Sequence, residues 1–114
     1  MSPARAITVM LSLFCAASAS AHAQVVRLDR PDATLEEPFS FVRGVRELSN
    51  GRLLVADWIE NRVVIADFAT QGVRQAMREG PGPQEVRLPT AIHRLRGDSS
   101  LLVDEGNNRL HVLG

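Results

Sequence analysis

The chain of 114 residues contains no lysine and no tyrosine, and it has a single cysteine and a single tryptophan. Its 13 basic residues are therefore all arginine, and they balance 13 acidic residues at a formal charge of zero. A neutral chain lacks the basic surface that nucleic-acid binding requires, so we expect no nucleic-acid partner. Apolar residues make up 45% and charged residues 23%, as in globular proteins.

The first 23 residues have the pattern of a secretory signal peptide. Arg5 precedes the uncharged apolar residues 6–17, and Ala21 and Ala23 are the small residues that a signal peptidase reads. We expect a signal helix, cleavage near Ala23 and Gln24, and a secreted or periplasmic protein. The apolar stretch has 12 residues, fewer than the about 20 that span a bilayer as a helix, so we expect no stable membrane span.

Cys15 lies inside the apolar stretch and would leave with it, so the mature chain can form no disulfide. A lipid-anchored cysteine is the alternative, but Phe14 occupies the preceding position, where a lipoprotein signal has a small residue. Residues 24–114 contain 12 arginines and 13 acidic residues, a formal charge of −1. This balance indicates no electrostatic attraction to anionic lipid or nucleic acid.

The rest of the chain contains an internal repeat with an offset of 47 residues. Residues 41–67 align with residues 88–114 without a gap. Five columns are identical: Leu48/Leu95, Leu54/Leu101, Asp57/Asp104, Asn61/Asn108 and Arg62/Arg109. Six further columns pair apolar residues, so identity and pattern together define the register. This period is typical of β-propeller blades, which have about 40 to 50 residues.

Short β-branched runs within each repeat predict strands and no helix. We expect them at 41–48, 53–56, 62–67 and 73–77 in the first unit, and at 91–96, 100–103 and 109–113 in the second. Asn50-Gly51 and Gly97-Asp98 lie at the hairpin turns, where glycine and asparagine adopt a positive φ at little cost. The predicted fold class is all-β, with antiparallel meander blades of a β-propeller: about two blades, the second incomplete.

Four segments follow from this division of the chain. They are the signal peptide (1–23), an N-terminal segment (24–40), the first blade with its linker (41–87) and the second, incomplete blade (88–114). Within the second segment, residues 25–28 are a candidate ring-closing strand. The linker holds two prolines and two glycines between 79 and 85, and it lacks the lysine of a phosphate-binding loop. Because propellers have about 4 to 8 blades, we expect missing C-terminal blades or, less favoured, self-association.

The second unit resembles the NHL repeat, a β-propeller repeat. The resemblance rests on Leu88-Pro89-Thr90-Ala91-Ile92 and on residues 101–112, where an apolar strand ends in Asp104 and an Asn-Arg turn follows. Residues 53–65 fit the same pattern, and residues 80–85 resemble the linker of exported bacterial six-bladed propellers. The resemblance implies a binding or scaffold module that acts through loops on one face. It also implies an alternative, a propeller hydrolase or lyase similar to metal-dependent lactonases.

One polar pattern recurs in both units: Asp57, Asn61 and Arg62, then Asp104, Asn108 and Arg109. Such a set can bind an anion or a metal-bearing ligand, but a structural role is favoured. Aspartate accepts hydrogen bonds from turn amides, asparagine tolerates the left-handed conformation, and arginine bridges a carboxylate. Repetition favours architecture too, because a catalytic site needs its residue once.

The remaining candidates predict no catalytic, cofactor or metal residue. His93 and His111 have no partner at metal-ligand spacing, so a packed strand histidine is the favoured interpretation. None of the common hydrolase nucleophile motifs occurs. Trp58, in the turn of the first unit, is either an exposed contact residue or an anchor between blades. The cofactor is left unknown, and the expected partner is an unidentified protein or small ligand.

Overall fold

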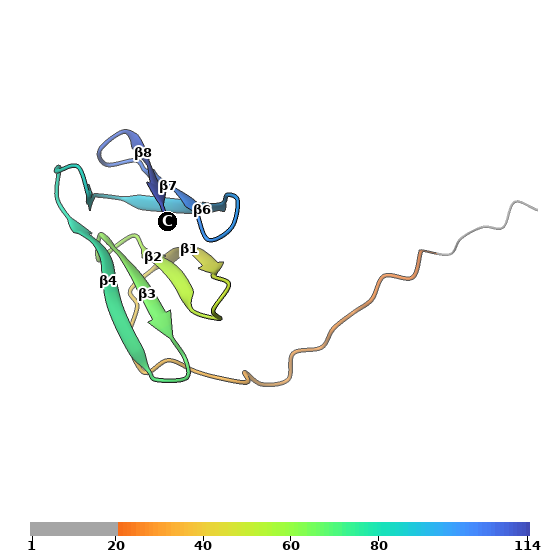
Figure 1. Cartoon of the computed structure of the whole chain (residues 1–114). Helices are drawn as coiled ribbons and strands as arrows, with labels where there is room; N and C mark the ends of the chain where they lie inside the picture. Colours follow the sequence, from red (N-terminus) through yellow and green to blue (C-terminus); the bar gives the residue numbers. More distant parts are fainter. Residues whose placement is uncertain (1–20) are drawn as a thin grey trace, which may run out of the picture.

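The computed structural model describes residues 21–114, which form two sheets of mainly antiparallel strands (Figure 1). The first sheet has the order β1 (Val42–Glu47), β2 (Leu53–Asp57), β3 (Arg62–Asp67), β4 (Gly72–Glu79) and β5 (Glu85–Val86). The second has the order β6 (Pro89–Arg94), β7 (Ser100–Asp104) and β8 (Arg109–Leu113). The described residues contain no helix, so the prediction of an all-β fold with antiparallel sheets is confirmed.

The seven predicted strands are present, with ends that differ from the predictions by up to two residues. The largest difference is in β6, which begins at Pro89 because this residue already pairs with Asp104, before a bulge that ends at Ala91. The sequence missed β5, two residues that pair in parallel with the end of β4. Its surroundings are rich in proline and glycine, which are rare in strands, so no local signal indicated it.

Hairpins join the antiparallel strands, and residues with positive φ occur in their turns. Gly51 and Gly97 have φ values of 78° and 61° in the first hairpin of each unit. Asn61 and Asn108 have φ values of 49° and 51° in the second hairpin. Asparagine tolerates this left-handed conformation better than most residues. The two copies of the repeat therefore turn the chain in the same way.

The main core lies between the two sheets. Its buried side chains are Leu54, Ala56, Val63, Met77, Val86 and Leu102. The sheets approach most closely where β1 lies beside β6. A Cβ on Gly44 of β1 would lie 3.0 Å from the backbone nitrogen of Ile92, so any larger residue would have to push the β6 backbone slightly away.

Arg46 of β1 fastens the first sheet to the turn between β6 and β7. This side chain is buried and donates hydrogen bonds to the backbone carbonyls of Gly97, Asp98 and Ser99 and to the Ser100 hydroxyl. The same turn is held from outside by Ser49, whose hydroxyl and backbone N–H donate to the Asp98 carboxylate at 2.6 and 2.9 Å. These hydrogen bonds, led by the one from the Ser49 hydroxyl, lower the pKa of Asp98.

The opposite face of the first sheet is covered by the N-terminal segment. Leu35 and Phe39 pack there against Val55, Val64 and Ala66. Residues 21–34, which precede this contact, run away from the sheets (orange in Figure 1) and form no strand.

The predicted signal helix and Cys15 lie outside the described residues, as does nearly all of the predicted signal peptide. Residues 25–28, the candidate ring-closing strand, are exposed and unpaired in the single chain. Within residues 21–114 there is no helix of the length and apolar character needed to cross a membrane.

Candidate functional site

Asp57, the last residue of β2, is fully buried and holds the chain where it enters β1. Its carboxylate accepts hydrogen bonds from the backbone N–H groups of Ser40 (2.8 Å), Phe41 (3.1 Å) and Glu60 (3.3 Å). A carboxylate that accepts several backbone N–H groups at once replaces the water lost on burial. Asp57 thus joins the entering segment and the β2–β3 turn.

Arg62, the first residue of β3, fastens the same segment through its side chain. Its Nη2 donates to the Pro38 carbonyl at 2.9 Å and lies 3.9 Å from Oδ2 of Asp57. Its Nη1 forms an ion pair with Glu37 at 3.0 Å. The guanidinium also lies over the Phe39 ring, 5.2 Å from the centroid. Arg62 therefore binds three consecutive residues, 37 to 39.

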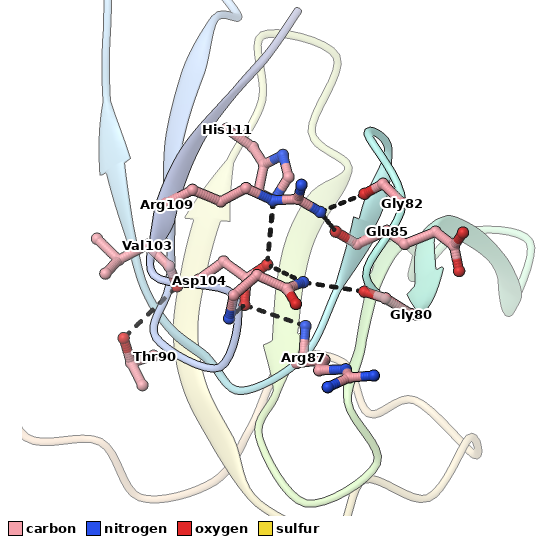
Figure 2. Close-up of polar contacts among 10 residues, drawn as sticks. Gly80, Gly82, Glu85, Arg87, Thr90, Val103, Asp104, Arg109 and His111 are labelled. Atoms are coloured by element: carbon pink, nitrogen blue, oxygen red, sulfur yellow. Dashed lines mark hydrogen bonds and ion pairs between the residues drawn. The ribbon is translucent and has the colours of Figure 1, made fainter.

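Asp104 has the corresponding role in the second unit, as Figure 2 shows. It is fully buried, and its Oδ1 accepts from the backbone N–H groups of Arg87 (3.0 Å) and Asn107 (3.3 Å). Its Oδ2 accepts from the Asn107 side chain at 2.8 Å. In the repeat alignment Arg87 corresponds to Ser40 and Asn107 to Glu60, so the same backbone contacts recur.

Arg109 corresponds to Arg62 and clamps the linker that enters the second unit (Figure 2). Its Nη2 donates to the Glu85 carbonyl at 2.9 Å and to the Gly82 carbonyl. Its Nε lies 3.8 Å from Oδ2 of Asp104. Glu85 occupies the column of Pro38, so both arginines bind the same backbone position of the entering chain.

Asn61 and Asn108 complete the pattern through their backbone conformation, with left-handed φ values in equivalent turns. The side chains differ in exposure, and only that of Asn61 contacts a carboxylate, Glu79, at 3.3 Å. The conserved geometry of this position is therefore a property of the turn backbone.

His111 distinguishes the second unit, because it occupies the column of Val64. It is buried, and its Nε2 lies 3.2 Å from both Oδ2 of Asp104 and Nε of Arg109. In a neutral imidazole this nitrogen either accepts from Arg109 or donates to Asp104. His111 is a packed strand histidine, as predicted; for His93, which is exposed on β6, that prediction is wrong.

Both buried aspartates have a pKa below the ordinary value. Burial alone would raise the pKa of each carboxyl, but the hydrogen bonds to the charged form outweigh it, together with Arg62 in the case of Asp57. The largest of these come from the Ser40 N–H at Asp57 and from the Arg87 N–H at Asp104. A general acid at neutral pH needs a raised pKa, so these carboxylates are suited to holding backbone and not to acting as general acids.

A different arrangement surrounds Trp58, which follows β2. Its ring and that of Phe41 form an edge-to-face pair with centroids 6.0 Å apart. The Arg43 guanidinium lies 5.7 Å from the Trp58 centroid and 5.8 Å from the Phe41 centroid. Phe41 and Arg43 are exposed, and Trp58 is half-buried. We call these three residues the aromatic–arginine cluster.

The aromatic–arginine cluster occurs in one unit only. Its columns in the second unit hold Leu88, Thr90 and Glu105, none of which is aromatic or cationic. The sequence analysis selected Trp58 but not Phe41 and Arg43. The three side chains meet through tertiary contacts that the sequence does not show. The backbone N–H of Trp58 donates to the Phe41 carbonyl, and the β1 bulge lies at Arg43. The signal that could have found them is their departure from the repeat.

The Arg43 guanidinium has no hydrogen-bond or ion-pair partner within the described part of the chain. Cation–π contact with two rings restrains the guanidinium, and its five N–H donors remain free to bind a ligand. Elsewhere in residues 21–114, no group of three His, Cys, Asp or Glu side chains is arranged to hold a metal ion.

The chain matches no family model, and a search of curated proteins also finds no match. The features that bear on function are therefore the repeat, the two sheets and the aromatic–arginine cluster.

Proposed function

We propose that this protein is an extracytoplasmic β-propeller module of the NHL type that binds or scaffolds a protein or small ligand through one end of its sheets. The observation that carries the proposal is the exposed aromatic–arginine cluster, which is present in one unit only. Two stacked meander sheets with a period of 47 residues support the propeller arrangement.

Repeated and unique residues have different roles in such an array. The repeated Asp57/Arg62 and Asp104/Arg109 pairs are occupied with their own backbone. Binding sites on repeat scaffolds are added to individual units, so the unique residues are the candidates for ligand contact. Among them, Trp58 and Arg43 are of the types most enriched at binding hot spots.

The chemistry of the cluster defines the class of ligand. The edge of the Arg43 guanidinium can bind a carboxylate through two parallel hydrogen bonds. The rings of Phe41 and Trp58, with Ile59 exposed beside them, offer an apolar surface. We therefore expect a ligand with a carboxylate next to an aromatic or apolar group, in a small molecule or in a peptide.

Trp58 is the only tryptophan of the chain, so its fluorescence reports on the cluster directly. Phenylacetate is the probe, and phenethylamine, which has the same ring with an ammonium group, is the matched control. We expect saturable quenching by phenylacetate that is lost in Arg43→Gln and kept in Arg52→Gln, which changes another exposed arginine. Equal responses to the two probes, or an unchanged response in Arg43→Gln, would contradict the proposal.

Export is supported by the pattern of the first 23 residues. When the full chain is produced in a bacterial host, we expect periplasmic protein whose N-terminal residue is Gln24. Cytoplasmic protein that retains Met1 would contradict export. The alternative of a lactonase-like hydrolase or lyase has no supporting side-chain arrangement among the described residues, so we propose binding alone.

A further inference from the structure

One further residue of the first unit departs from the repeat, and it adjoins the aromatic–arginine cluster. Glu60 follows Trp58 by two residues and occupies the column of Asn107. It is exposed, and its Oε1 accepts a hydrogen bond from the hydroxyl of Ser40, the residue before Phe41. This hydrogen bond joins the two segments that carry the rings of the cluster.

The second unit shows what this position does when it serves only the fold. The Asn107 side chain donates to the buried carboxylate of Asp104 at 2.8 Å and to the Gly80 carbonyl at 2.9 Å. A glutamate carboxylate has no N–H to donate, so Glu60 cannot make the equivalent contact with Asp57. Its backbone N–H still donates to Asp57, at 3.3 Å, as the Asn107 N–H donates to Asp104. The first unit therefore keeps the backbone contact and gives up the side-chain contact, and departures of this kind are expected at functional sites.

The charges of Glu60 and Arg43 are not paired with each other. None of the ion pairs within residues 21–114 includes either residue. The Oε2 atom of Glu60 also has no hydrogen-bond partner in this part of the chain, and both side chains are exposed. The site thus offers one anion and one cation to a ligand.

The two charges lie on either side of Phe41 along the entering chain. Glu60 is held by Ser40, and Arg43 follows Ser40 by three residues, which is about 10 Å of extended chain. The Arg43 guanidinium lies over the rings of Phe41 and Trp58, so the apolar part of the site lies between the charges. A ligand that uses all three features has an ammonium group, an apolar group and a carboxylate.

We propose that the cluster binds a zwitterion: a free amino acid or a short peptide with an aromatic or apolar side chain. This inference rests on the proposed function, because the carboxylate of the ligand binds Arg43 and its apolar group lies against Phe41 and Trp58. It adds that the ammonium group of the ligand binds Glu60. An ammonium group has three N–H donors, and the free Oε2 of Glu60 accepts one of them in a charge-assisted hydrogen bond.

The same two charges make the site selective. Glu60 repels a second carboxylate, and Arg43 repels a ligand whose only charged group is an ammonium. Like charges brought together in a site oppose the wrong ligand as effectively as opposite charges favour the right one. Dicarboxylates and simple amines are therefore poorer ligands than zwitterions of similar size.

Trp58 fluorescence measures what the ammonium group contributes. The ligands are phenylalanine, glycylphenylalanine and N-acetylphenylalanine, which keeps the ring and the carboxylate but has no ammonium group. We expect at least one of the two zwitterions to bind about threefold to fivefold more tightly than N-acetylphenylalanine, as one exposed ion pair allows. Tighter binding of phenylalanine identifies a free amino acid as the ligand, and tighter binding of glycylphenylalanine identifies a peptide.

Glu60→Gln removes the charge and keeps both the length of the side chain and the backbone contact with Asp57. We expect this variant to lose the preference for the zwitterion and to bind N-acetylphenylalanine at least as tightly as the unmodified chain does. Glu47→Gln, at an exposed glutamate of β1, is the matched control and should keep the preference. Because salt screens exposed charges, the preference of the unmodified chain should also fall at high ionic strength.

The outcomes separate this inference from the proposed function. The inference is overturned if neither zwitterion binds more tightly than N-acetylphenylalanine, if the preference persists in Glu60→Gln, or if Glu47→Gln loses it as well. In each of these cases the carboxylate site at Arg43 remains. An absence of saturable quenching by these three ligands and by phenylacetate would overturn both.

Discussion

The first and second units hold their entering chain segments in the same way and differ in what lies next to them. In both, a buried aspartate accepts hydrogen bonds from the entering chain, and an arginine binds a carbonyl of the same segment. At their outer edges, β3 is paired and β8 is not. The sequence pattern of a unit therefore determines its hairpins and its fastening, whereas the neighbouring unit determines which faces are buried.

One column shows the difference most clearly. Val63 is fully buried in the core between the sheets, whereas Leu110 in the same column is 60% exposed. Both are apolar, but only Val63 has a sheet packed against it among the described residues. The burial of this column therefore depends on the neighbouring sheet and not on the residue type.

Loss of either buried aspartate is expected to have the largest effect. Asp57→Ala leaves three backbone N–H groups without their acceptor, and Asp104→Ala leaves two together with the Asn107 side chain. We expect each substitution to lower the free energy of unfolding by about 3–5 kcal/mol, measured by urea denaturation with Trp58 fluorescence. A loss below about 1 kcal/mol in one unit would show that the two fastenings are not equivalent.

Arg46 and His93 occupy the same column and provide the next test. Arg46 is buried in its contacts with the β6–β7 turn, whereas His93 is exposed. We expect Arg46→Met to lower the free energy of unfolding by about 2–3 kcal/mol, and His93→Met to change it by less than about 0.5 kcal/mol. Similar effects in the two variants would contradict a joining role for Arg46.

Val63 and Leu110 give a smaller contrast. Val63→Ala should cost about 2 kcal/mol, because it removes buried apolar surface and leaves a cavity. In the monomer, Leu110→Ala should cost less than about 0.5 kcal/mol. Equal costs in dilute solution would mean that the exposed face is already covered.

The smallest effect concerns pH. The pKa values of Asp57 and Asp104 are lowered in the folded chain, so the unfolded chain binds more protons near pH 4. Their contribution to stability is complete above about pH 5 and is lost as the pH falls below about 4. Denaturation at several pH values should show this loss, and Asp57→Asn should reduce it. Glu47→Gln, at an exposed carboxylate, is the control; the same reduction in Glu47→Gln would contradict the assignment to buried aspartates.

Much of the fold could be predicted from the sequence, because strands and hairpins depend on local signals. The β-branched runs and the glycine and asparagine turns indicated seven strands. The missed strand, β5, depends on a parallel contact with β4 across the linker, which local propensity does not encode. The strand predicted from residue 91 in fact begins at Pro89. The cause is similar, since Pro89 pairs with Asp104 although proline lacks an N–H.

The candidate site was predicted in part. The repeat alone selected Asp57 and Asp104, but their partners are backbone groups of residues 40 and 87, which a side-chain pattern cannot indicate. Trp58 was selected as a candidate contact, while Phe41 and Arg43 lie 17 and 15 residues before it and meet it only across the β1–β2 pair. His111 was predicted to pack, but its contact with Asp104 depends on the β7–β8 register.

The two units share their hairpins and the contacts that hold their entering segments, and they differ in what lies at their outer edges. Amide hydrogen exchange of β3 and β8, followed in dilute solution of the full chain, tests this difference. We expect β3 to be protected by its pairing with β4, and the outer amides of β8 to exchange rapidly. Protection of β8 that equals that of β3 would contradict this difference between the units.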